Sequence, residues 1–369
     1  MNASLIVAIV LVGAAAVAFE LGISSAIIEI FAGVMLALWI DDIESLEWLR
    51  FLANLGMLGL MFMAGFEVDV VRLRRTWKAS VCIGVMSLVL PLTGVFAVTY
   101  FLLGLEFLAA GLVAIALSTT SLALVYHALK DRGLLESDSG QALLGAASVV
   151  DVLSMVSLAL LLGDVGWGTL VFLLVVVPAI VGLPRVGRWI FRRYKGSIVE
   201  VELRFLLVTL VGMGFMAENV GGVHPAVVAF AVGIVMSEVM EEHAALEEKL
   251  KGIVFSLFGP VFFLHAGAQL DLRQLTPDLL GTAGILFVVA CSLKFAGAAL
   301  PTRWFLDVSG RFVGLLFNYR LSFGIIAASV GLKSGVLSDG LYAVILLVVM
   351  GSAALPVIFL HDRPTELDG

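Results

Sequence analysis

The stretch AASVVDVLSM, Ala146 to Met155, places one carboxylate, Asp151, in a run of small and apolar residues. A charge in such a run is costly wherever the run is buried in a membrane. The apolar segment around it, residues 140–163, is long enough to cross a bilayer as a helix. The sequence therefore predicts a membrane helix with an ionisable group near its midpoint, where such groups commonly serve function.

The composition of the whole chain agrees with a membrane protein. Of its 369 residues, 61% are hydrophobic and 14% are charged, whereas a soluble domain carries about 25% charged residues. The net charge of −7 is summed over both faces of a membrane, and no basic run suits a nucleic acid. Cys82 and Cys291 lie far apart in apolar segments without metal-site spacing. We therefore expect no disulfide, no structural metal and no cofactor.

Thirteen segments are apolar and long enough to span a bilayer, which predicts an all-α polytopic fold. They are residues 3–21, 23–40, 48–68, 79–103, 107–129, 140–163, 167–191, 201–219, 223–240, 253–270, 279–300, 310–332 and 337–360. The first lacks the basic start of a signal peptide, so we expect a spanning helix. No segment is typical of a soluble domain. The longest polar stretch, SEVMEEHAALEEKLK at 237–251, predicts a short amphipathic helix on the cytoplasmic side.

The distribution of Lys and Arg predicts the orientation. The segments that follow the third, fifth and seventh spans hold Arg72, Arg74, Arg75, Lys78, Lys130, Arg132, Arg188, Arg192, Arg193 and Lys195. The loops at 41–45, 104–106 and 163–164 hold none. Cytoplasmic loops are the richer in Lys and Arg. We therefore expect a cell (inner) membrane protein with its N-terminus outside and its C-terminus in the cytoplasm.

Several polar residues fall near the middle of the predicted spans. They are Ser118, Thr119, Thr120 and Ser121; Ser148, Asp151 and Ser154; Lys294; and Asn318, Arg320 and Ser322. The second group is spaced three residues apart and shares one side of its helix, so it can offer a carboxylate and two hydroxyls to a small cation. Four consecutive hydroxyl residues compete with the helix for backbone bonds. They predict a break, which is tolerated at this depth where it lines a cavity or is covered by protein.

Structural interpretations of these residues stay open. A single Ser or Thr in a membrane helix can bond to its own backbone. Lys294 and Arg320 can be clamps that cap broken helices, and Asp151 can belong to a structural ion pair.

Six stretches in order resemble the monovalent cation:proton antiporter superfamily, and most closely its branch of bacterial and archaeal Na+/H+ antiporters and glutathione-gated K+ efflux systems. They are FMAGFEVDV at 62–70, ALSTTSLALVYHAL at 116–129, GQALLGAASVVDVLSM at 140–155, FGPVFFLHAGAQLDL at 258–272, LKFAG at 293–297 and NYRLSFGIIAASVGLKSGVLSD at 318–339. The similarity covers nearly the whole chain, and the spacing of the stretches also matches.

The resemblance implies one transmembrane transport unit built from two inverted repeats, 1–163 and 201–369, joined by a linker helix at 164–200. Each repeat would supply a broken helix, and the two would cross beside the ion-binding carboxylate. The resemblance also implies a homodimer.

Two positions depart from the family's pattern. Val150 stands where the family usually has a first polar residue before the aspartate, and Ser322 stands where its Arg-Gly-Glu motif has the glutamate. Lys294 therefore lacks the partner implied for it. It can pair with Asp151, stay neutral or find another acceptor.

Together these features predict a secondary transporter for pH homeostasis, not an enzyme. Na+, or else Li+ or K+, would exchange for H+ by competition at Asp151, and a single carboxylate predicts electroneutral one-for-one exchange. Further ligands would be Thr120, Ser121, Ser148 and Ser154, with Lys294 and Arg320 compensating charge and Ser118, Thr119, Asn318 and Ser322 lining the broken helices. Two alternatives remain: an organic-anion or other solute carrier of the same fold, in which Lys294 and Arg320 bind the anion, and a channel-like or sensory homologue that has lost exchange.

Overall fold

The computed structural model describes residues 3–21, 23–40, 42–68, 76–163, 167–194, 200–241, 243–270, 272 and 275–360. Every regular element in these ranges is helical, which confirms the all-α prediction. Within them, eight helices are long and apolar enough to cross a membrane, and four shorter apolar helices accompany them. The count of thirteen spans and the orientation stay predictions. Of the residues used for the orientation, Arg72, Arg74, Arg75 and Lys195 lie outside the described ranges.

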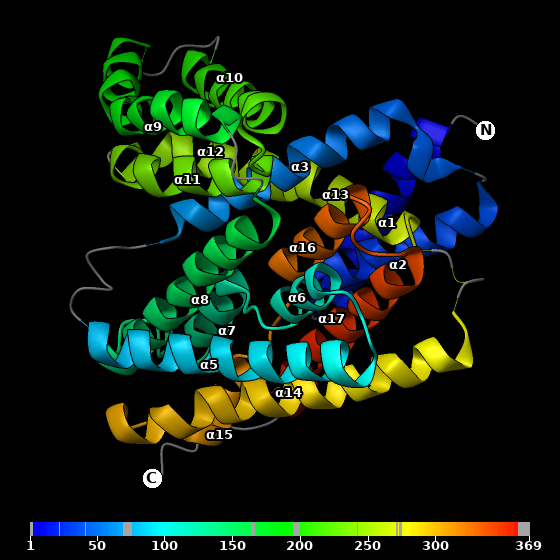
Figure 1. The fold of residues 1–369 in the computed structure, drawn as a ribbon. Coiled ribbons are helices and arrows are strands. Elements are labelled where there is room, and N and C mark those ends of the chain that lie inside the picture. The colour runs from blue at the N-terminus through cyan, green and yellow to red at the C-terminus, as the bar shows by residue number, and fades with distance from the viewer. Residues whose placement is uncertain are drawn as a thin grey trace. The chain divides into compact units, whose positions relative to one another are not determined.

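The chain folds into two compact units, each made of two separate stretches (Figure 1). Unit 1 combines Met1–Val68 with Leu162–Gln269, and unit 2 combines Asp69–Leu161 with Leu270–Gly369. The division of the chain into two inverted repeats stays a prediction.

The elements of each unit follow in chain order. Unit 1 holds α1 (Ala3–Leu21), α2 (Ser25–Trp39), η1 (Ile43–Ser45), α3 (Glu47–Phe66), α9 (Trp167–Tyr194), α10 (Val201–Met216), η3 (Ala217–Gly221), α11 (Pro225–Glu241), α12 (Ala244–Ile253), η4 (Val254–Phe258) and α13 (Gly259–Ala268). Unit 2 holds α5 (Trp77–Ala97), η2 (Val98–Leu102), α6 (Phe107–Ala116), α7 (Leu122–Asp131), α8 (Asp138–Leu162, except its last residue), α14 (Pro277–Phe305), α15 (Gly310–Leu316), α16 (Ser322–Lys333) and α17 (Asp339–Leu360).

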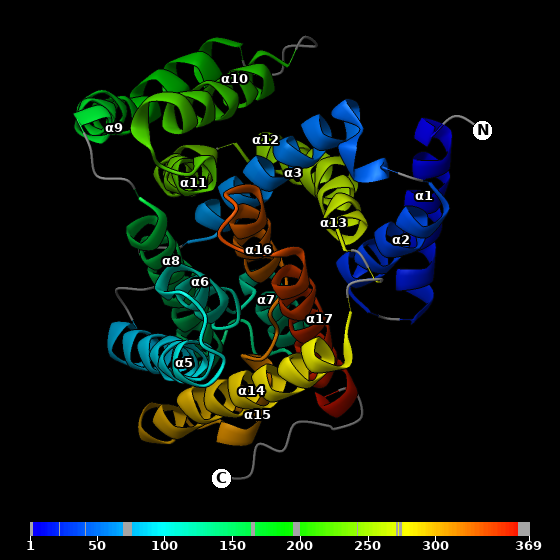
Figure 2. The ribbon, with the colours of Figure 1, turned by 45° about the vertical axis from the view of Figure 1, so that its right-hand side comes forward.

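Unit 1 is packed through close backbone contacts. Figure 2 shows α2 beside α13, and Gly33 of α2 lies so close to the Leu264 carbonyl of α13 that no Cβ would fit between them. In the same way Gly65 of α3 faces the Phe230 carbonyl of α11. Glycines allow membrane helices to approach this closely, which increases the van der Waals contact between them.

The polar stretch at 237–251 does not form one separate amphipathic helix, so that prediction is wrong in its bounds. Its first residues extend α11, and the rest form α12, which continues through η4 into α13 as one candidate span, Ala245–Ala268. Charged residues of α12 can lie at the start of a span because one of their positive charges is neutralised locally. Lys251 Nζ pairs with Glu247 Oε1 at 2.6 Å, and the same ammonium lies 5.7 Å from the centre of the Phe66 ring.

Unit 2 is organised around α5 and α14, which lie side by side along their length (Figures 1 and 2). A methyl group on Gly297 of α14 would lie 2.5 Å from the Met86 carbonyl oxygen of α5. On α5, a methyl group on Gly84 would lie 2.8 Å from the Ala146 carbonyl oxygen of α8. Close packing against α5 therefore positions α8, the helix that carries Asp151.

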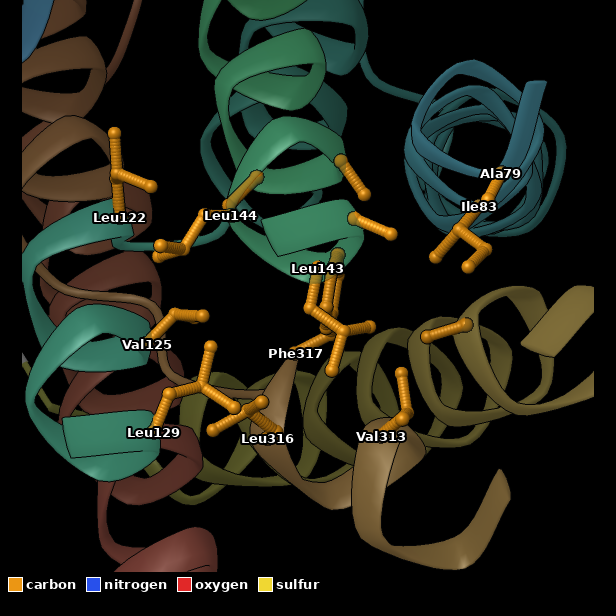
Figure 3. Packing of buried hydrophobic residues seen from close by; sticks show 14 residues of the cluster. Ala79, Ile83, Leu122, Val125, Leu129, Leu143, Leu144, Val313, Leu316 and Phe317 are labelled. Atoms are coloured by element: carbon orange, nitrogen blue, oxygen red, sulfur yellow. The ribbon is translucent and has the colours of Figure 1, made fainter. Parts of the chain in front are cut away.

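A buried hydrophobic cluster of unit 2 joins α5, α7, α8, α14 and α15 (Figure 3). Figure 3 shows Leu143 of α8 beside Phe317, which follows α15, while Leu129 of α7 and Leu316 of α15 lie near each other. The cluster links α7, α8 and α15 to the start of α5, where Ile83 is fully buried. It thus holds parts of both interrupted segments, α6–α7 and α15–α16, against the helix of Asp151.

Candidate ion-binding site

Two helices of unit 2 are interrupted. The first stops at Ala116 and resumes at Leu122, and the second stops at Leu316 and resumes at Ser322. The first interruption falls on the four hydroxyl residues, as the sequence predicts. Each interruption leaves the last carbonyls of one helix and the first N–H groups of the next without their usual partners.

Hydroxyl groups satisfy part of the first break. Ser118 Oγ donates to the Ala114 carbonyl at 2.6 Å, and Thr119 Oγ1 donates weakly to the Ala116 carbonyl at 3.4 Å. Both residues are buried. Both hydroxyl groups therefore donate to carbonyls at the C-terminal end of α6. Such bonds to the nearby backbone are the structural interpretation given above for a Ser or Thr in a membrane helix.

The two breaks are bonded directly to each other. The Ser121 backbone N–H donates to the Tyr319 carbonyl at 2.7 Å, and Thr120 Oγ1 donates to the Phe317 carbonyl at 3.2 Å. A methyl group on Gly324 would lie 2.8 Å from the Ala116 carbonyl oxygen, so the start of α16 also touches the end of α6. The predicted crossing of two broken helices is therefore present in unit 2.

Lys294 reaches the first break from α14. Its side chain is fully buried, and its Nζ donates to the Ser118 carbonyl at 2.6 Å. Asp151 and Arg320 belong to the same unit as this ammonium. A cation at the carbonyl end of a helix is favourable because the helix dipole places partial negative charge there. Lys294 thus caps the carbonyl end of α6.

Arg320 belongs to the second break and is also fully buried. Its Nη2 donates to the Ala290 carbonyl of α14 at 2.7 Å and to Asn318 Oδ1 at 2.9 Å. Asn318 Nδ2 in turn donates to the Gly314 carbonyl of α15 at 2.9 Å. In the part of the chain that the structure describes, Arg320 Nε and Nη1 have no hydrogen-bond partner. Among the described residues, Nη2 therefore makes the hydrogen bonds that anchor the guanidinium.

Asp151 lies on α8 with 5% of its surface exposed, and its neighbour Val150 is fully buried. Ser148 and Ser154 on the same side of the helix are buried as well. Ser148 Oγ donates to the Leu144 carbonyl at 3.1 Å, so its oxygen lone pairs are left to accept or to coordinate. Ser154 Oγ has no hydrogen-bond partner among the described residues. The hydroxyl oxygens of Ser148 and Ser154 therefore keep lone pairs that can coordinate a cation on the same side of α8 as the carboxylate.

All the residues that the sequence singles out fall in unit 2. Hydrogen bonds link Ser118, Thr120, Lys294, Asn318 and Arg320 to the two breaks or to α14. By contrast, Ser322 opens α16 and is only half-buried, and no hydrogen bond of its side chain is formed with the described residues.

Sequence reasoning missed the role of Arg132. Its guanidinium donates to the Leu360 carbonyl at the end of α17 and lies 5.0 Å from the centre of the Phe312 ring of α15. It therefore ties the end of α7 to α15 and α17. The only signal was its position directly after a broken helix, which we used for orientation alone.

Comparison with known proteins agrees with this arrangement. The family model described as sodium/hydrogen exchanger, transmembrane, matches residues 6–361. A probable Na(+)/H(+) antiporter 3 of Methanocaldococcus jannaschii is 29% identical over 331 residues, which cover 85% of this chain and 84% of that protein. The Na(+)/H(+)-K(+) antiporter GerN of Bacillus cereus is 27% identical over 84% of this chain and 81% of its own length.

The fold is similar to a solved structure, the sodium proton antiporter MjNhaP1 from Methanocaldococcus jannaschii. The TM-score is 0.68 at 14% identity, and the match covers 96% of this chain and 94% of the other. The family model spans nearly the whole described chain and includes both broken helices, α8 and α14. The chain therefore belongs to the sodium/hydrogen exchanger family, whose members are multi-pass membrane cation/proton antiporters.

Proposed function

We propose that this antiporter exchanges one monovalent cation for one proton at Asp151, with Na+ as the first candidate and Li+ or K+ as the alternatives. One observation carries the proposal: among the described residues of unit 2, Asp151 is the only buried carboxylate. It shares that unit with both broken helices and with buried Lys294 and Arg320. A buried ionisable group with these neighbours is a default candidate for an ion or proton path.

Competition between a proton and a cation for one carboxylate is enough to couple their transport in opposite directions. Asp151 can be neutralised by a proton or by a cation, and each occupant excludes the other. A bare carboxylate is costly to move through a low-dielectric region. The unit that carries Asp151 therefore changes its access from one side to the other readily when it is loaded and slowly when it is empty.

The oxygen atoms around Asp151 support a site for a hard cation, which prefers carboxylate, hydroxyl and carbonyl ligands. Ser148 and Ser154 lie on the same side of α8 and keep unused oxygen capacity. Thr120 gives its hydroxyl hydrogen to the Phe317 carbonyl, which leaves its lone pairs for a ligand. We propose these three and Ser121 as the further ligands.

Lys294 and Arg320 compensate charge in this proposal. Lys294 is held by the Ser118 carbonyl and Arg320 by the Ala290 carbonyl, so both cations have fixed backbone anchors. Apolar Val150 supplies no second acid, and one carboxylate predicts electroneutral exchange. The organic-anion carrier stays the alternative, because Arg320 Nε and Nη1 have no hydrogen-bond partner among the described residues.

We further propose a homodimer in the cell (inner) membrane, with the N-terminus outside and the C-terminus in the cytoplasm. In unit 1, only 17% of the apolar window of α1 and 22% of that of α9 are buried, against 67% for α8 in unit 2. These faces of α1 and α9 therefore offer apolar surface that a second copy or lipid can cover.

Flux measurements in proteoliposomes test the proposal. We expect Na+ to drive proton movement by the wild type, and we expect Asp151→Asn to abolish it because the amide cannot exchange a proton. Asp138→Asn is the matched control, since Asp138 is an exposed acid at the start of the same helix. Parallel titrations with Li+ and K+ identify the cation. Wild-type flux by Asp151→Asn would place the site elsewhere.

A further inference from the structure

The last turns of α9 carry a basic face that the proposed transport does not use. Arg185, Arg188, Arg192 and Arg193 follow the spacing of one helix side, with Trp189 between them. These five side chains line a hollow of about 570 Å³ on unit 1. We call this surface the arginine face.

The guanidinium groups of the arginine face have no polar partner among the residues that the structure describes. Within the described part of the chain, none of them forms a hydrogen bond or ion pair, and Arg193 only lies 5.8 Å from the centre of the Tyr194 ring. Two lysines of the same unit behave differently: Lys249 pairs with Glu200 and Lys251 with Glu247, each at 2.6 Å. Four close positive charges that form no ion pair with the described residues repel one another, so the arginine face favours an external anion.

An apolar stripe runs into the arginine face along the same side of α9. Leu174, Val177 and Val181 are 76%, 49% and 58% exposed, and Trp189 is 63% exposed. Residues 174–194 of α9 have the length and composition of a membrane span, with the apolar stripe in its first half and the arginines in its second half. Tryptophan is enriched where the apolar and headgroup regions of a membrane meet.

We propose that the arginine face binds the headgroup of an anionic phospholipid, whose acyl chains lie along Leu174, Val177 and Val181. Guanidinium groups bind phosphate oxygens through two parallel hydrogen bonds, which a lysine ammonium cannot do. Basic residues at the end of a membrane helix also gain energy from anionic lipids. Along the helix, apolar side chains that suit acyl chains are followed by guanidinium groups that suit a phosphate. A phospholipid presents its acyl chains and its phosphate in the same order.

A simpler explanation is that the arginines only fix the orientation and offset the carbonyl end of α9, for which any positive charge suffices. Substitution by lysine separates the two explanations. Arg188→Lys combined with Arg192→Lys keeps charge and orientation but removes the paired donors. A second variant, Arg188→Gln with Arg192→Gln, removes the charge. Arg303→Gln with Arg311→Gln is the matched control, since both are exposed arginines of unit 2.

The melting temperature of the delipidated protein in an uncharged detergent is then measured with phosphatidylglycerol, with phosphatidylcholine and with glycerol phosphate. A ligand that binds only the folded state raises the melting temperature. We expect phosphatidylglycerol to raise that of the wild type and of the control, with no rise from the other two. In the lysine and glutamine variants we expect less than about half of this rise.

Three outcomes overturn the proposal. Equal shifts with phosphatidylglycerol and phosphatidylcholine mean that charge is not recognised. An equal shift with glycerol phosphate means that the ligand is a free phosphate. A lysine variant equal to the wild type means that diffuse charge is sufficient. Native mass spectrometry of the wild type, which should retain phosphatidylglycerol over phosphatidylcholine, keeps the proposal testable if a variant fails to fold.

Discussion

The break between α6 and α7 and the break between α15 and α16 present the same physical problem, and they satisfy it with different residues. In the first break, Ser118 donates its hydroxyl to the Ala114 carbonyl and accepts Lys294 on its own carbonyl. The cation therefore comes from α14, 176 residues further along the chain.

The second break carries its own cation. Arg320 lies within the break and donates to the Ala290 carbonyl of α14, while Asn318 bonds both to Arg320 and to the Gly314 carbonyl at the end of α15. The first break is thus capped by a partner from another helix, whereas the second is braced by its own residues. From this difference we expect the second break to contribute more to stability and the first to contribute more to the titration of the site.

The largest effect on stability should follow Arg320→Ala. The substitution removes two hydrogen bonds from a buried charged group and leaves Asn318 Oδ1 without its donor. Hydrogen bonds to charged groups contribute about 1.5–3 kcal/mol each, so for two bonds we expect a loss of about 3–6 kcal/mol and a lower melting temperature in detergent. Arg303→Ala, at an exposed position of α14, serves as the control. Equal melting temperatures for the two variants would show that the second break does not need its arginine.

An intermediate effect on stability, and the largest on pH dependence, should follow Lys294→Ala. One charged hydrogen bond is lost, which corresponds to about 2 kcal/mol. With the positive charge gone, Asp151 holds a proton more readily, so proton competition against the cation extends to higher pH. The pH profile of Na+-driven flux should move upward in pH more than the maximal rate falls. Lys294→Gln, which keeps a donor but no charge, separates capping from charge. An unchanged pH profile would contradict coupling between Lys294 and Asp151.

The smallest effect should follow Gly324→Ala, which tests the contact between the two breaks. The added methyl would lie 2.8 Å from the Ala116 carbonyl oxygen and 3.0 Å from Val349 Cγ2. Overpacking of this size costs about 1 kcal/mol or somewhat more, and the melting temperature should fall accordingly. Gly281→Ala is the control, because nothing lies within 4 Å of a methyl group there. Equal behaviour of both variants would mean that the two breaks need not touch.

The sequence was informative where side-chain chemistry leaves a pattern. Four consecutive hydroxyl residues predicted the first break, and the structure interrupts the helix there, at 117–121. The second break was expected from the family resemblance, since residues 318–322 alone contain no comparable run. Apolar segments of bilayer length predicted the helical class because a bilayer admits few alternatives.

The sequence was uninformative where the partner is a backbone carbonyl. Every residue has the same backbone carbonyl. The sequence therefore could not identify the Ser118 carbonyl as the acceptor of Lys294, or the Leu360 carbonyl as the acceptor of Arg132. Burial also depends on the three-dimensional packing: only 2% of the surface of Glu29, within α2, is exposed. The roles of the residues around Asp151 stay proposals.

Proton release on cation binding tests the central claim most directly. The purified protein is placed in weakly buffered detergent solution at a pH at which Asp151 still holds its proton. Enough Na+ is added to displace that proton, and the pH change is recorded with a dye. If the proton and the cation compete for Asp151, about one proton leaves for each bound cation, and Asp151→Asn releases none. Binding of Na+ without proton release, or equal release by Asp151→Asn, would contradict the account.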